Sequence, residues 1–120
     1  MAPVTGEHVL SGGFARQISK QPTVRPVDQR EEYAAREGGA IYTLLTWDPK
    51  ARLNGTVVMR LYDDENRPLL ESKPKKTDLT PGDFVFTQWQ VPLPSRPGVY
   101  RIDVTLDAAI CWRGFFRVTE

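Results

Sequence analysis

Two residue types that serve as nucleophile and base in hydrolases occur once each in this chain. His8 is the only histidine and Cys111 is the only cysteine. A Ser-His-Asp or Cys-His arrangement would have to use His8, which lies near an end of the chain, where ordering is often poor. Cys111 stands between Ile110 and Trp112, with Arg113 as the only nearby base, so nothing around it indicates an activated thiol. The sequence therefore predicts a structural cysteine and a chain that is not an enzyme.

One run of oxygen-bearing side chains could gather around a hard cation. Asp63, Asp64, Glu65 and Asn66 are consecutive, and calcium requires six or more oxygen ligands. The run lacks the spaced carboxylates of a helix-loop-helix calcium site, and solvated turn residues explain it equally well. One histidine and one cysteine cannot build a zinc site without several carboxylates, and no glycine-rich phosphate loop is present. We expect no metal and no cofactor.

The three tryptophans raise the alternative of a small-ligand or carbohydrate-binding domain, because exposed indole rings can stack on sugars. Trp47, Trp89 and Trp112 all fall within or at the end of apolar stretches. Large aromatic side chains usually belong to the core in domains of this size, so we expect all three to be buried. The exposure of Trp47 and Trp89 separates the ligand-binding alternative from a protein-binding module.

The elements that must position these residues are short strands. Ten prolines and nine glycines fall between short apolar stretches, and no long amphipathic helical period occurs. Residues 28–37 predict one or two helical turns or an ordered loop, because Asp28 and Glu31 have capping-box spacing and Gly38-Gly39 could end a helix. The predicted strands are 14–19 at an edge, 40–47 in a central position, 56–63 after a turn at Asn54-Gly55, 69–73, and 83–91.

The last two strands are predicted to form a hairpin. Apolar and polar residues alternate over 99–106, a turn follows over 107–110, and a second strand covers 111–119. The residues predicted to face the core are Tyr100, Ile102, Val104, Leu106, Trp112, Phe116 and Val118. Pairing these with one another sets Leu106 opposite Trp112 and Ile102 opposite Phe116. On the other face Arg101 then lies opposite Arg117, and Asp103 opposite Phe115.

That outer face is the candidate contact surface. Two arginines opposite each other are unfavourable, and a diagonal Asp103 offsets only part of the repulsion. Arginine beside an exposed aromatic is the composition of interface hot spots, although an ordinary charged face with one apolar residue is the alternative. We predict that Arg101, Asp103, Arg113, Phe115 and Arg117 bind a protein partner or a second copy of this chain.

The end of the chain also resembles known proteins. Pro97-Gly98 followed by Tyr100, Ile102 and Val104 in alternation is similar to the closing hairpin of immunoglobulin-like accessory domains, and residues 79–104 resemble bacterial sandwich proteins that inhibit intracellular proteases. The resemblance and the strand spacing imply an all-β, antiparallel immunoglobulin-like sandwich of about seven strands. The expected function is a non-catalytic protein-binding or adaptor module, with a protease-inhibitor-like sandwich as a further alternative.

Length and charge narrow the remaining possibilities. The 120 residues suit one domain spanning 1–120, with 40% hydrophobic and 26% charged residues. The 16 basic and 15 acidic residues are spread over both halves, so no basic arm for nucleic acid is present. No apolar run is long enough to span a membrane, and residues 1–10 do not read as a secretory signal. If Met1 is the natural start we expect a cytoplasmic protein, and otherwise a periplasmic or secreted one.

Overall fold

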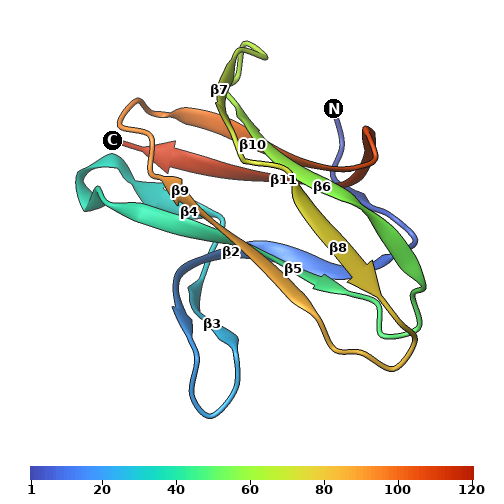
Figure 1. Ribbon diagram of the computed structural model, residues 1–120. Coiled ribbons are helices and arrows are strands. Elements are labelled where there is room, and N and C mark those ends of the chain that lie inside the picture. Colours follow the sequence, from blue (N-terminus) through green and yellow to red (C-terminus); the bar gives the residue numbers. More distant parts are fainter.

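The computed structural model describes residues 1–120 as two β-sheets packed face to face (Figure 1). The only helical element is one 3-10 turn, η1 (Ala35–Glu37). The strands are β1 (Val4–Thr5), β2 (Val9–Ser19), β3 (Arg25–Gln29), β4 (Glu32–Ala34), β5 (Ala40–Trp47), β6 (Leu53–Tyr62), β7 (Pro68–Glu71), β8 (Lys75–Leu79), β9 (Phe86–Pro92), β10 (Gly98–Leu106) and β11 (Ala109–Thr119). The all-β sandwich predicted from the sequence is confirmed.

The two sheets differ in size. The larger has the order β1-β11-β10-β6-β7, with β4 added beside β11 and β8 added beside β6. The smaller has the order β3-β2-β5-β9, and its β2–β3 hairpin projects from the body of the sandwich (Figure 1). All strand pairs are antiparallel except the short pair between β4 and β11. None of the elements is a helix with the length and apolar character needed to cross a bilayer.

Side chains that alternate along the strands form the core between the sheets. In β6, for example, Val57, Met59 and Leu61 are buried and the residues between them are only partly so. The indole of Trp112, on β11, packs against the Phe14 ring, with 5.7 Å between their centroids. It also lies directly on two glycines, because a Cβ built on Gly12 or on Gly114 would come within 2.3 Å of an indole atom. Trp112 therefore joins β2 of one sheet to β11 of the other.

The central strand was predicted with its observed bounds, whereas the first long strand was predicted only in part. β5 covers the predicted 40–47 and lies between β2 and β9, as expected of a strand with apolar residues on both faces. The strand predicted over 14–19 forms the second half of β2, but its predicted edge position is wrong, since β2 begins at Val9 and lies between β3 and β5. Its first half lacks an apolar pattern because Gly12 leaves room for the Trp112 indole.

The turn expected at Asn54-Gly55 is also wrong, because both residues lie inside β6. A Cβ on Gly55 would lie 2.7 Å from Leu106 Cδ1, so this glycine permits close packing rather than a turn. The turn after β6 is where the sequence placed it. In this turn Asn66 has a positive φ of 61°, a conformation that asparagine tolerates better than most residues.

Residues 28–37 form an ordered loop with a short strand and one 3-10 turn. β4 and η1 replace the helix that was one of the two predicted forms, and the capping box expected from Asp28 and Glu31 is not formed. The Glu37 carboxylate instead accepts a hydrogen bond of 2.6 Å from the backbone N–H of Ala34. Tyr33, 1% exposed, is the apolar anchor of the segment. Gly38 ends the turn with a positive φ, as predicted.

The terminal hairpin is confirmed, but its predicted register is wrong by two residues. Arg101 lies opposite Phe115 rather than Arg117, and Asp103 lies opposite Arg113 rather than Phe115. The turn consists of only two residues, Asp107 and Ala108, both with positive φ. The register then changes between Val104 and Thr105, where β11 holds one extra residue. The parity was nevertheless right, since Trp112, Phe116 and Val118 face the core.

Candidate functional site

The five predicted contact residues lie together on the outer face of the larger sheet, but they are not equally accessible. Arg101 and Asp103 belong to β10, and Arg113, Phe115 and Arg117 belong to β11. Arg101 and Asp103 are buried, Arg113 and Phe115 are partly buried, and Arg117 is exposed. The expectation of an exposed arginine cluster is therefore wrong for Arg101.

Three of these side chains form a covered ion-pair network. The Arg113 guanidinium donates two hydrogen bonds to the Asp103 carboxylate, 2.7 Å from Nε to Oδ1 and 3.0 Å from Nη2 to Oδ2. The Arg101 Nε lies 3.3 Å from the same Oδ1. These hydrogen bonds from Arg113 to Asp103 raise the pKa of the Arg113 guanidinium. Asp103 lies beside both guanidinium groups and compensates one of their two charges, and Arg101 is not opposite Arg117 as the sequence had indicated.

Distant segments cover Arg101. Its guanidinium lies over the Tyr62 ring, 4.2 Å from the centroid. Its Nη1 donates a hydrogen bond to Asn66 Oδ1 and lies 3.0 Å from the Met1 sulfur. Tyr62 ends β6, Asn66 lies in the turn that follows, and Met1 belongs to the start of the chain. The Arg101 side chain is thus engaged in contacts within the chain and is covered on the outer face, so it is not available to contact a partner.

Phe115 and Arg117 remain accessible, and they line an open hollow. Its volume is about 480 Å³, and its lining residues are Arg30, Glu31, Glu32, Val99, Phe115, Phe116 and Arg117. Val99, 39% exposed, lies opposite Arg117 across the hairpin. Phe115 also lines a second hollow of about 220 Å³ together with Pro3, Gly13 and Arg113. The accessible part of the site therefore combines apolar side chains with charged ones.

The hollow opens where one edge of β11 has no neighbouring strand. β1 pairs with this edge at Trp112 and Arg113, and β4 pairs with it from Arg117 onward. Residues 114–116 between them pair only with β10, on the opposite side. A gap between two short edge strands is a place where the side chain of another molecule can reach the sheet.

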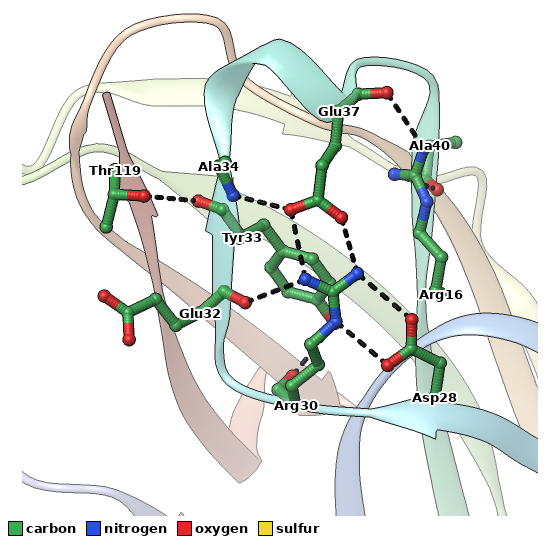
Figure 2. A network of polar contacts seen from close by, with 9 residues as sticks. All are labelled: Arg16, Asp28, Arg30, Glu32, Tyr33, Ala34, Glu37, Ala40 and Thr119. Carbon is green, nitrogen blue, oxygen red and sulfur yellow. Dashed lines mark hydrogen bonds and ion pairs between the residues drawn. The ribbon is translucent and has the colours of Figure 1, made fainter.

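A second polar network fixes one wall of this hollow. Figure 2 shows the Arg30 guanidinium between the carboxylates of Asp28 and Glu37, with bonds of 3.0 Å from Nε to Asp28 Oδ1 and 2.5 Å from Nη2 to Glu37 Oε1. The Arg30 carbonyl accepts a hydrogen bond from the Tyr33 hydroxyl, and the Arg30 guanidinium lies over the Tyr33 ring. Hydrogen bonds from Arg30 and from the Ala34 N–H lower the pKa of Glu37 to about 2, and burial raises the pKa of Tyr33 to about 12.

The Arg30 network predicts a stability loss in acid. The Glu37 pKa is about 2 in the folded chain, below its ordinary value of 4.5. Its contribution is complete above about pH 4.5 and is lost as the pH falls toward 2. Urea unfolding at several pH values should therefore give a smaller loss of stability across this window for Glu37→Gln than for the wild type. Parallel curves for the two proteins would show that Glu37 is not coupled to folding.

The residues considered for other chemistries are placed as follows. Trp47, Trp89 and Trp112 are 1%, 8% and 5% exposed, so the indole stacking surface required by the carbohydrate alternative is missing. Cys111 is buried, and burial raises the pKa of its thiol to about 11, so the thiol is protonated at neutral pH. The Asp63 carboxylate accepts hydrogen bonds from the N–H groups of Glu65 and Arg67, which makes it a turn residue.

Similar folds occur in proteins of known structure. A scan against protein-family models gives no match, and a search of curated proteins gives no relative. An immunoglobulin-like protein of Pseudomonas aeruginosa has a TM-score of 0.53 and 13% identity, over 95% of this chain and 98% of that one. The chain is an immunoglobulin-like β-sandwich, as predicted at the level of the fold.

Two larger proteins contain a similar unit. The alkylpurine DNA glycosylase AlkC of Pseudomonas fluorescens matches with a TM-score of 0.54 and 12% identity, over 91% of this chain and 30% of that one. β-Glucosidase 3B of Thermotoga neapolitana matches with a TM-score of 0.50 and 13% identity, over 92% of this chain and 16% of that one. At these identities the likeness concerns the fold alone.

Proposed function

We propose that this chain is a non-catalytic protein-binding module whose contact surface is the hollow beside β11. The observation that carries the proposal is that Phe115, at the unpaired part of the β11 edge, lines one hollow together with the accessible Val99 and the exposed Arg117. An aromatic residue with a neighbouring arginine is enriched in protein interfaces. Of the five residues predicted from the sequence, Phe115 and Arg117 are assigned direct contact.

The remaining three residues act as a support in this proposal. Asp103 holds Arg113, and Arg101 lies beside Phe115 in the strand register. A side chain whose neighbours are already ordered loses little conformational entropy when a partner binds. Glu31 and Glu32 line the hollow together with Arg117, and Glu32 is the cross-strand neighbour of Arg117, which favours a partner that presents an apolar side chain beside groups of both charges.

The proposal is tested by capturing binding partners with a paired substitution. The variant Phe115→Ser with Arg117→Glu removes an apolar side chain from the lining of the hollow and reverses the charge of another lining residue. We expect the amount of any partner protein captured by this variant to be lower than the amount captured by the wild-type chain by at least about tenfold, as for hot-spot residues. Quantitative capture from an extract of the source organism measures this loss.

A matched control uses the far side of the same sheet. Leu69 on β7 and Lys76 on β8 are exposed, so Leu69→Ser with Lys76→Glu makes the same two chemical changes away from the hollow. Retention should be unchanged in this control. Equal retention by both folded variants would contradict the assigned surface.

A further inference from the structure

β9 is an edge strand without charged residues. It pairs with β5 on one side, and no strand pairs with its other side (Figure 1). Residues 84–95, which contain it, include no charged side chain, and no other stretch of the sequence without charge is as long. Edge strands are usually protected from pairing with other chains by charges, prolines or short length. Between Phe86 and Val91, β9 has none of these protections.

The other edge strands of the two sheets are protected in these ways, and the gap in the edge of β11 covers only residues 114–116. β1 and β4 have two and three residues. Charged residues and prolines occur on β3, β7 and β8, namely Arg25, Pro26, Asp28, Pro68, Glu71, Lys75, Lys76 and Asp78. β9 is therefore the edge strand with the fewest features that oppose pairing with another strand.

The backbone of β9 presents hydrogen-bonding groups outward in a fixed pattern. The Trp47 N–H donates to the Val85 carbonyl, 3.1 Å, and the Leu93 N–H donates to the Gly39 carbonyl, 2.9 Å. Peptide groups alternate in direction along an antiparallel strand, so the odd-numbered residues of this segment turn toward β5. The N–H and C=O groups of Phe86, Gln88 and Gln90 consequently turn toward the open side.

We propose that β9 pairs antiparallel with β9 of a second copy of this chain, with the two-fold axis at Gln88. In this register Gln88 lies opposite Gln88, and Phe86 opposite Gln90. Each outward N–H and C=O then finds a partner in the other copy, because the outward residues are spaced evenly about Gln88. The pairing also sets Phe84 opposite Pro92 of the other copy.

Two exposed aromatic residues favour a second copy over water at this edge. Phe84 and Phe86 are 73% and 41% exposed, and both lie in or next to β9. Each copy would contribute both rings to the contact, and no charge on either side opposes it. A single pair of short strands buries less area than a standard stable interface, so we expect a dimer that forms and dissociates with concentration.

The test is the concentration dependence of the mass in solution. Sedimentation equilibrium of the whole chain should show the mass rising from 13.6 kDa toward twice that value as the concentration increases. Gln88→Lys places two ammonium groups against each other across the axis and should weaken dimerisation by about tenfold or more. Gln17→Lys makes the same change at an exposed position of β2 and should leave it unchanged.

Each outcome decides the proposal. A dimer lost in Gln88→Lys and kept in Gln17→Lys supports it, especially if the amides of Phe86, Gln88 and Gln90 exchange more slowly at high concentration. A wild-type chain that stays monomeric, or a dimer that survives Gln88→Lys, overturns it. Circular dichroism and thermal unfolding of each variant confirm that the fold is kept, which is expected because the Gln88 side chain is only partly buried.

Discussion

Replacing Trp112 by alanine is expected to destabilise the chain by about 3–5 kcal/mol, the usual cost of removing a large buried aromatic side chain. The indole is 5% exposed and lies between the backbones of Gly12 and Gly114. Neither glycine has a side chain that could move into the vacated space, so little of the cavity can be filled from these two sides. Urea unfolding followed by far-ultraviolet circular dichroism measures the loss.

The glycines provide the matched control for this prediction. Gly114→Ala in the wild type brings a Cβ within 2.3 Å of the indole and should cost about 1–3 kcal/mol through overpacking. In the Trp112→Ala background the same methyl group enters an empty space, so its cost should largely disappear. A double-mutant cycle detects this coupling. Additive effects of the two substitutions would show that Trp112 does not pack on Gly114.

Removing the charge of Asp103 is expected to destabilise the chain by a similar amount. Its side chain is 8% exposed, and it pairs with Arg101 and Arg113, whose side chains are 11% and 15% exposed. Asp103→Asn leaves two covered guanidinium groups without their shared counter-charge. Breaking a buried pair from one side typically costs about 3–5 kcal/mol. The free energy of unfolding in urea is the quantity to measure.

An exposed pair on the same sheet serves for comparison. Arg60 and Glu71 form an ion pair of 2.7 Å on neighbouring strands, and the Glu71 side chain is 62% exposed. Glu71→Gln should cost no more than about 1 kcal/mol, the usual value of a surface salt bridge. A loss for Asp103→Asn as small as that for Glu71→Gln would mean that water compensates the two arginines.

The features predictable from the sequence were those set by local alternation. A period of two decided which side of β10 and β11 faces the core, because successive side chains on a strand point to opposite faces. It also located β5, whose apolar residues on both faces indicated a central strand. The strands β1, β3, β4 and β8 were missed. β1 and β4 have only two and three residues and carry no detectable period, and β3 and β8 consist mostly of polar and charged residues.

The register of the last hairpin depended on features with weak sequence signals. A two-residue turn with positive φ at both positions is usually marked by glycine or asparagine, whereas Asp107-Ala108 contains neither. One available signal was overlooked. Choosing the register that sets Asp103 opposite Arg113, instead of Arg101 opposite Arg117, satisfies the rule that opposite charges pair across strands.

The burial of Arg101 could not be derived from its own strand. The groups that cover it, Tyr62, Asn66 and Met1, come from segments far apart in the sequence. A hollow such as the one beside Phe115 arises in the same way, because β1 and β4 approach β11 from opposite ends of its edge. Such sites depend on the tertiary arrangement, and no local sequence pattern predicts them.

The passage of the chain from one sheet to the other has a mechanical consequence. β3 ends at Gln29 in the smaller sheet and β4 begins at Glu32 in the larger one, so only two residues connect the layers at this point. Arg30, one of the two, pairs with Asp28 on β3 and with Glu37 in η1. Sliding of one layer over the other would have to break this clamp. Because these ion pairs already hold the wall of the hollow in the free chain, we expect its backbone to change little when a partner binds.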